Sequence, residues 1–412
     1  MKTKVRYSRA LLLGAILTNC SAAQTSNDAA HATGGADACA AADTAGPSGG
    51  RPEPQVADGV KTLLQAFDRM PVVAFGDSHG LVEEIDFLIT LIRNPDFPKK
   101  VNNIVVEFGN SLPQYQALMD RYILDGEEIP NLSDTWSNTT QAFIYSFQTP
   151  LIPKLFRAIR EVNRQLGSST PRDKRVRVIL GDPPIDWSQV PDDPTGSGAG
   201  HAKAMTFLDG RDESHARIIG QLIDQGQKVL FIAGSFHIMR APASAGPNRN
   251  AVGLLDQSHP GATFVSITHH FFNSRDFSLE ARLEPWPKSS MAMVRGSWLG
   301  SLPLWRITPG ALAPPVGGGS GRGGPQLPDG GDGIIMDAGA DFKDPVIEEV
   351  TDAYLYLGAH DQLTTLVDSP FTFFRTLSQA TIDELDRRSR IITGQPFDTE
   401  RPVRLIYGLP PQ

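Results

Sequence analysis

The chain has 412 residues, of which 40% are hydrophobic and 20% are charged, so it can bury a large core and is not disordered as a whole. Its formal net charge of −8 argues against nucleic-acid binding, because recognition of phosphates depends on clustered Lys and Arg. We therefore expect a globular protein that binds no nucleic acid.

The N-terminus has the layout of a secretory signal, in which basic residues precede an apolar run over 10–17. The run is too short to span a bilayer, which needs about 20 residues. Leu17-Thr18-Asn19-Cys20 resembles a bacterial lipobox with Cys20 as the acylated residue, and Ser21-Ala22-Ala23 offers a competing ordinary cleavage site. We expect a signal peptide over 1–23, or a lipoprotein signal over 1–19, and export to the bacterial cell envelope, periplasmic or surface, with a lipid anchor at Cys20.

Composition divides the rest of the chain. Residues 24–56 are rich in Ala, Gly, Ser, Thr, Asp and Pro and predict a flexible tether, and 57–308 predict the main domain. A Gly- and Pro-rich insertion over 309–333 is expected to be disordered. The segment 334–412 has one strand-like run and one helical pattern, which we expect to return to the main domain; the alternative is a small C-terminal helical appendage. Since acylation or cleavage leaves Cys39 without an intramolecular partner, we expect no disulfide framework.

Short apolar runs of strand length alternate with helical patterns along the main domain. Strands are expected at 72–75, 104–108, 176–180, 229–233, 263–268, 290–294 and 353–357, and helices at 60–67, 81–92, 115–126, 151–166, 205–223 and 371–388. Such alternation is typical of an α/β fold, with a mostly parallel sheet covered by helices on both faces.

Four of these apolar runs end on an acid or a histidine. Asp77 and His79 follow the first run, Glu107 closes the second, Asp182 the third, and His237 comes just after the fourth. Because open α/β sheets bind ligands beyond the carboxyl ends of their strands, we expect these side chains to converge. Histidine and carboxylate side chains move protons or hold metals, so the pattern predicts a catalytic or metal site.

Each candidate also has a structural interpretation. Asp77 or Ser78 could be the N-cap of the next helix, Glu107 could pair with an arginine, Asp182 precedes two prolines in a turn, and His237 could be a structural histidine. Two further signals are Arg211 and the pair His269 and His270. Arg211 opens a helix where the dipole disfavours a cation, which indicates that it is held for a carboxylate or an oxyanion.

The order of these motifs resembles a known superfamily. The segments Gly-Asp-Ser-His-Gly (76–80), Val-Val-Glu-Phe (105–108), Gly-Asp (181–182), Arg-Asp-Glu (211–213) and Gly-Ser-Phe-His (234–237) resemble those of erythromycin esterases, Tiki proteases and ChaN-type haem-binding lipoproteins. The resemblance implies a centre formed by His79 and Glu107, with His237 as the second histidine and Arg211 on the intervening helix. Members hydrolyse esters with a histidine as base, cleave peptides with a metal, or bind haem.

We therefore expect a hydrolase that acts on an ester or amide bond of a small molecule or peptide, with His79 as base or metal ligand and Glu107 beside it. A divalent metal, where present, would be held by His79, Glu107, Asp182 and His237. Two alternatives stay open. One is a haem-binding lipoprotein of the ChaN type. The other is a GDSL-type serine esterase with Ser78 as nucleophile and a D-x-x-H motif at Asp212 to His215 or at Asp256 to His259.

Overall fold

The computed structural model describes residues 50–78, 80–141, 150–240, 250–268, 277–307, 345–364 and 378–397. The chain divides into two units, 1–46 and 47–412, and all described residues belong to the second. Several sequence predictions fall outside the described residues and stay predictions: the signal, Cys20, Cys39, the tether up to residue 49, His79, His269, His270 and the insertion over 309–333.

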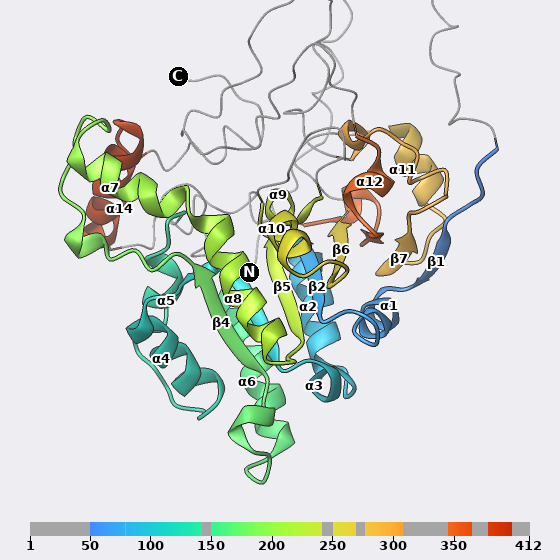
Figure 1. The fold of residues 1–412 in the computed structure, drawn as a ribbon, viewed down its shortest axis with the longest axis horizontal. Helices are drawn as coiled ribbons and strands as arrows, with labels where there is room; N and C mark the ends of the chain where they lie inside the picture. Colours follow the sequence, from blue (N-terminus) through green and yellow to red (C-terminus); the bar gives the residue numbers. More distant parts are fainter. Residues whose placement is uncertain are drawn as a thin grey trace, which may run out of the picture. The chain divides into compact units, whose positions relative to one another are not determined.

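The described residues build one eight-stranded sheet, which confirms the predicted α/β fold class. Its strands are β1 (Gln55–Asp58), β2 (Val72–Asp77), β3 (Asn103–Asn110), β4 (Arg177–Asp182), β5 (Val229–Gly234), β6 (Thr263–Thr268), β7 (Ser290–Met293) and β8 (Ala353–Tyr356). The spatial order is β1-β7-β8-β6-β2-β5-β3-β4, and Figure 1 shows β4 and β1 at opposite sides of the sheet. Five neighbouring pairs are parallel, and β7 runs antiparallel to both β1 and β8.

Helices and short turns connect these strands. The helices are α1 (Gly59–Ala66), α2 (Val82–Arg93), α3 (Phe97–Lys100), α4 (Pro113–Ile123), α5 (Asp134–Ser137), α6 (Leu151–Leu166), α7 (Ala199–Leu208), α8 (Arg211–Asp224), α9 (Ser235–Ile238), α10 (Ala251–Ser258), α11 (Phe277–Leu283), α12 (Ile347–Val350) and α14 (Gln379–Thr393). The 3₁₀ turns are η1 (Arg172–Lys174), η2 (Trp187–Gln189), η4 (Leu304–Arg306) and η6 (His360–Gln362). Within the described part of the chain, every helix is too short or too polar to cross a lipid bilayer.

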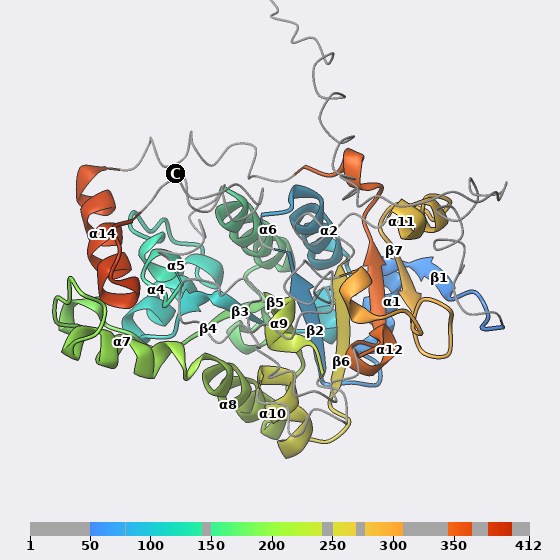
Figure 2. The ribbon, with the colours of Figure 1, turned by 90° about the horizontal axis from the view of Figure 1, so that it is seen from above.

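Helices cover both faces of the sheet, and each face has its own hydrophobic core. Figure 2 shows α2 and α6 on one side of the strands and α8 and α10 on the other. Alternate residues of a strand point to opposite faces, so Val73 and Phe75 of β2 enter the core under α2 and α6. Val72 and Ala74 enter the core under α8 and α10. We name these the α2 face and the α8 face.

The sequence did not predict the helices α3, α5, α9, α10, α11 and α12, and two of its element boundaries also differ from the structure. One helix was expected over 205–223, but α7 ends at Leu208 and α8 begins at Arg211. The intervening Gly210 is the N-cap of α8, and glycine lowers helix stability at a junction that the apolar pattern alone does not mark. The second difference is that Gln55 and Val56, expected in the tether, begin the edge strand β1.

The segment after residue 334 contributes to two places in the fold. Strand β8 pairs with β6 and β7 inside the sheet. Helix α14 packs instead on α7 and η2, where Leu385, Ile391 and Ile392 join Trp187 in a third, smaller core. We name this contact the α14 cluster. The predicted helix over 371–388 begins outside the described residues, and the described helix starts at Gln379 after the Ser378 N-cap.

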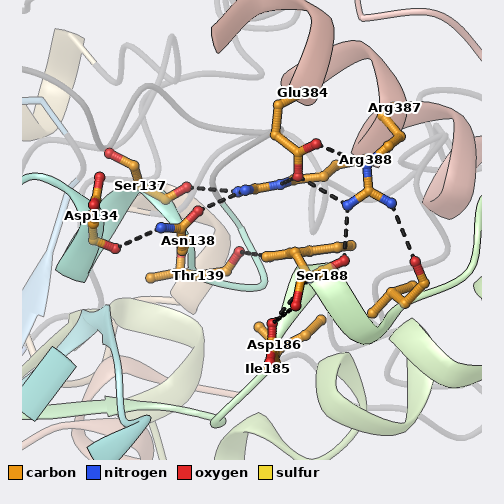
Figure 3. A network of polar contacts seen from close by, with 12 residues as sticks. Asp134, Ser137, Asn138, Thr139, Ile185, Asp186, Ser188, Glu384, Arg387 and Arg388 are labelled. Atoms are coloured by element: carbon orange, nitrogen blue, oxygen red, sulfur yellow. Dashed lines mark hydrogen bonds and ion pairs between the residues drawn. The ribbon is translucent and has the colours of Figure 1, made fainter. Parts of the chain in front are cut away.

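A buried arginine connects the α14 cluster to the rest of the domain (Figure 3). Arg388 donates to Glu384 on its own helix, to the Ser137 carbonyl at 2.8 Å and to the Asn138 side chain at 2.6 Å. Its guanidinium also lies over the Trp187 ring, 5.0 Å from the ring centroid. These contacts hold α14 against α5 and η2.

We predict that Arg388→Met loosens α14, because it removes one of the two arginines that donate to Glu384 and leaves the partly buried Ser137 and Asn138 acceptors without this donor, at a cost of about 3 kcal/mol. Hydrogen exchange of the α14 amides should become about 100-fold faster. The matched control is Arg390→Met on the same helix, whose exposed pair with Asp386 contributes less than about 1 kcal/mol. Equal exchange rates in the two variants would contradict this role of Arg388.

Candidate functional site

The four strands whose runs end on an acid or histidine are neighbours in the sheet. Their spatial order is β2-β5-β3-β4, and all three pairs between them are parallel. Their carboxyl ends therefore lie along one edge, as the sequence predicted. The side chains at that edge nevertheless form two separate groups.

Glu107 lies at the centre of the first group and is 1% exposed. It shares the strand face of Val105, so the two-residue period of β3 directs it toward the α8 face. Its Oε2 atom accepts a hydrogen bond from the Gly234 amide at 2.8 Å and lies 3.6 Å from Nε2 of His237. The Nη2 atom of Arg211 is 3.9 Å from the same oxygen. The carboxylate is thus buried beside hydrogen-bond donors and the Arg211 cation, as buried acids require.

Asp182 is fully buried and lies on the other side of Arg211. Thr140 donates its amide to Oδ2 and its hydroxyl to Oδ1, both at 2.7 Å. The Nε atom of Arg211 is 3.4 Å from Oδ1. Burial raises the pKa of Asp182 to about 6, against the lowering effects of Arg211 and the two Thr140 hydrogen bonds. Arg211 therefore lies between two buried carboxylates. This agrees with the expectation that a carboxylate or an oxyanion holds an arginine at the start of this helix.

His237 is held by Asp212. The two residues come from α9 and α8, and the distance between Nδ1 of His237 and Oδ1 of Asp212 is 2.7 Å. Asp212 Oδ1 also accepts the Ala251 amide at 2.9 Å, which fixes the carboxylate in place. Burial alone would raise the pKa of Asp212, but the charge and hydrogen bond of His237 outweigh it and keep that pKa below its usual value. The pair therefore has the geometry of a histidine oriented by a carboxylate.

His215 lies next to this pair and is completely buried. Its ring packs 5.3 Å from that of Phe231 and 5.7 Å from that of His237, with an angle of 69° between the two imidazoles. Burial, followed by the charge of His237, lowers the pKa of His215 well below its usual value, so the ring is neutral. Among the described residues, neither ring nitrogen has a hydrogen-bond partner.

Asp77 belongs to a second group, on the α2 face. It has the same parity along β2 as Val73 and Phe75, and its carboxyl group pairs with that of Glu84 from α2. Glu84 is fully buried and accepts the Ser78 amide with both oxygens, at 3.0 and 3.2 Å. Burial and the nearby Asp77 raise the pKa of Glu84 well above its usual value. The two carboxyl groups therefore share a proton.

The structure thus brings together Glu107, Asp182, Arg211 and His237, while His79 lies outside the described residues. The structural interpretation of Asp77 and Ser78 as N-caps does not hold, because α2 begins after Leu81 with no side-chain cap. The interpretation of Glu107 as an arginine partner agrees with its distance to Arg211. That contact and a catalytic role are compatible.

Sequence reasoning missed Glu84 and His215 as members of these groups. Both lie on the apolar stripes of their helices, where a polar residue is expected to be buried and to contact other polar groups. Glu84 stands between Leu81 and Leu88 at helical spacing, and His215 precedes Ile219 and Leu222 at the same spacing. The signal was present in the period-3.6 pattern. Thr140 had no such signal, because its role depends on a loop that follows α5.

The comparisons with known proteins give distant structural matches. No family model and no curated protein matches the chain. Three solved structures match, and the first is a Bacillus cereus protein with 12% sequence identity and a TM-score of 0.41, over 75% of this chain and 95% of that chain. The second is ChaN of Campylobacter jejuni, described with cofacial haem binding, with 11% identity and a TM-score of 0.31, over 52% of this chain and 90% of that chain. The third is the type III effector HopBA1, with 15% identity and a TM-score of 0.29, over 56% of this chain and 90% of that chain. At such TM-scores and identities the similarity assigns no function to this chain.

We predict that Glu84→Gln stabilises the protein increasingly as the pH rises. The folded state holds the Glu84 proton more tightly than the unfolded chain, where the pKa is near 4.5, so wild-type stability falls as the pH rises above that value. Glutamine stays neutral, donates to Asp77 and accepts from Ser78. Its melting temperature should exceed that of wild type by about 3 °C or more at pH 8.

The control for this prediction is Asp86→Asn, which changes an exposed acid on the same helix that pairs with Lys154. Its melting temperature should follow that of wild type at every pH between 5 and 8. A Glu84→Gln variant that is less stable than wild type at pH 8 would show that the carboxyl group is ionised and needed in that form.

Proposed function

We propose that this chain is a hydrolase of ester or amide bonds in which a histidine at the carboxyl ends of the central strands activates water. The 2.7 Å contact between Asp212 and His237 carries this proposal. An Nδ1–H that donates to a carboxylate fixes the neutral tautomer with its lone pair on Nε2. A lone pair held in a fixed direction beside a binding edge is what a general base requires.

The groups that face Nε2 support water activation. Oε2 of Glu107 is 3.6 Å away, too far for a direct hydrogen bond, so a water molecule that lies beside the pair can contact both atoms. Within the described residues, Nε and Nη2 of Arg211 make no hydrogen bond, although both lie near carboxylates. These donors are available to an oxyanion that develops on a carbonyl under attack. The general base His237, the position for water and the oxyanion-stabilising Arg211 thus all lie around the Glu107 carboxylate.

Each reaction step follows from these roles. His237 accepts a proton from the water through Nε2 while the water oxygen attacks the carbonyl carbon. Negative charge develops on the carbonyl oxygen, and Arg211 stabilises it. The imidazolium, held by Asp212, then returns the proton to the leaving alcohol or amine, so the acid and amine or alcohol products form with no net proton change at the enzyme.

His79, which the resemblance to the erythromycin esterase superfamily implies at the centre of the site, is a second candidate for the general base. The metal set predicted from the strand ends, which includes Asp182, fits less well, because both oxygens of Asp182 already accept from Thr140 and Oδ1 faces the Arg211 cation. The steps above therefore use protein groups alone.

The geometry also favours water over Ser78 as nucleophile. The two D-x-x-H motifs do not supply the required pairs, since Asp212 binds His237 and Asp256 binds Arg240. His259 pairs with Asp224 instead.

We predict that His237→Ala lowers kcat/KM by about 10²- to 10⁴-fold on a panel of chromogenic esters and amides. Asp212→Asn should lower it by at least about tenfold, because the wrong tautomer of His237 becomes favoured. The matched control is His259→Ala, which removes the histidine of another Asp–His pair, at 3.1 Å, and should retain full activity.

A further variant tests the nucleophile. Ser78→Ala should retain hydrolysis if water attacks the substrate directly, and a loss as large as that of His237→Ala would exclude water activation. If wild type hydrolyses no compound of the panel while it is folded by circular dichroism, the proposed reaction is wrong for these substrate classes.

A further inference from the structure

We infer that Asp212, His215 and His237 form a binding site for one divalent transition-metal ion. This site differs from the metal set predicted from the strand ends (His79, Glu107, Asp182 and His237), and it shares only His237 with that set. One ligand atom from each of the three residues lies within 4.8 Å of the others. Three protein ligands at such separations can close around a single ion.

The secondary structure explains why the three side chains meet. Asp212 and His215 lie three residues apart in the first turn of α8, so they share one face of the helix. His237 comes from α9, directly after β5, and approaches that face from the sheet. The two imidazole rings lie 5.7 Å apart and are inclined by 69°. Rings in this arrangement direct nitrogens toward a common point more readily than stacked rings.

The burial of His215 without hydrogen-bond partners among the described residues independently supports the metal site. The side chain is 0% exposed, and both of its nitrogens lack a hydrogen-bond partner among the described residues. Burying an imidazole in this way is unfavourable, and a purely apolar residue would pack against Phe231 at no such cost. A metal ion would satisfy one nitrogen of the ring.

The chain makes room for this ring at one glycine. A Cβ atom at Gly181 would lie 2.7 Å from Cδ2 of His215, closer than real contacts allow. Glycine at the end of β4 therefore permits the imidazole to lie directly against the strand. The close approach keeps the ring beside Asp212 and His237.

The donor set indicates the class of metal. Two imidazole nitrogens and one carboxylate oxygen suit Zn²⁺, Co²⁺, Ni²⁺ or Cu²⁺, whereas Mg²⁺ and Ca²⁺ prefer oxygen alone. Asp212 is further fixed by the Ala251 amide, a support that metal ligands commonly have. Three protein ligands leave a coordination position open to solvent or to a ligand.

The inference goes beyond the proposed hydrolysis and does not depend on it. A metal ligand must be deprotonated at the atom that binds, so an ion held by Asp212 competes with the Nδ1–H of His237 for the carboxylate. Metal binding is measured directly, without an activity assay. Hydrolysis without metal binding would contradict this inference alone, and metal binding without hydrolysis would contradict the proposed function alone.

The test is a titration of the metal-free full chain with Co²⁺, followed by its visible absorption, and with Zn²⁺ by calorimetry. Wild type should bind one ion per chain, and Mg²⁺ should not compete. His215→Leu should weaken the affinity at least about 100-fold. His79→Ala and Asp182→Asn should leave it unchanged, and so should His259→Leu as the control for a histidine outside the site.

The variants also separate this site from its rival. If the Co²⁺ affinity falls in His79→Ala and Asp182→Asn but not in His215→Leu, the ion lies in the metal set predicted from the strand ends, and the inference is wrong. Absence of Co²⁺ binding to wild type would equally overturn it. If His215→Leu does not fold, His215→Gln replaces it. A variant with the unliganded melting temperature of wild type that loses the Co²⁺-induced rise in melting temperature supports the site.

Discussion

The site depends on the compensation of one buried positive charge, the Arg211 guanidinium, by two buried carboxylates. Arg211 is the first residue of α8, where the helix dipole opposes a positive charge, and its side chain is mostly buried. Asp182 from β4 and Glu107 from β3 lie on either side of the guanidinium and offset both effects. The same two carboxylates would be unfavourable without it. The start of α8 is therefore tied to the ends of two strands, and Asp212 and His215 are positioned by the same turn.

Strand parity sends Asp77 and Glu107 to opposite faces of the sheet, whereas Asp182, which has the parity of Leu180, reaches Arg211 from the last position of β4. Glu107 shares the strand face of Val105 and meets His237, whereas Asp77 shares the face of Phe75 and meets Glu84. The α8 face thus holds the groups suited to chemistry. The α2 face holds a protonated carboxyl pair that accepts the Ser78 amide and so fixes the backbone just before residue 79. Gly80 follows with φ of 94°, a conformation that favours glycine.

Much of this was readable from the sequence, and the remainder has physical reasons. The buried strands were predictable because both faces of the sheet are covered, which makes their sequences continuously apolar. Counting the two-residue period from Val73 and Val105 would also have separated Asp77 from Glu107. The pairing of Asp212 with His237 was not predictable, because it depends on where α8 begins after Gly210. An irregularity in the register of β3 beyond Val106 likewise leaves no trace in the pattern.

The two uses inferred for His237 differ in what Asp212 must do. As a partner of a general base, the Asp212 carboxylate accepts a hydrogen bond from Nδ1–H and keeps the Nε2 lone pair directed toward Glu107. In the proposed metal site, the carboxylate exchanges that hydrogen bond for the ion, which it binds together with His215 and His237. His215 contributes nothing to the first arrangement, since the described residues offer its nitrogens no hydrogen bond, and completes the second. The proposed metal site would therefore explain a buried histidine that the proposed proton transfer does not use.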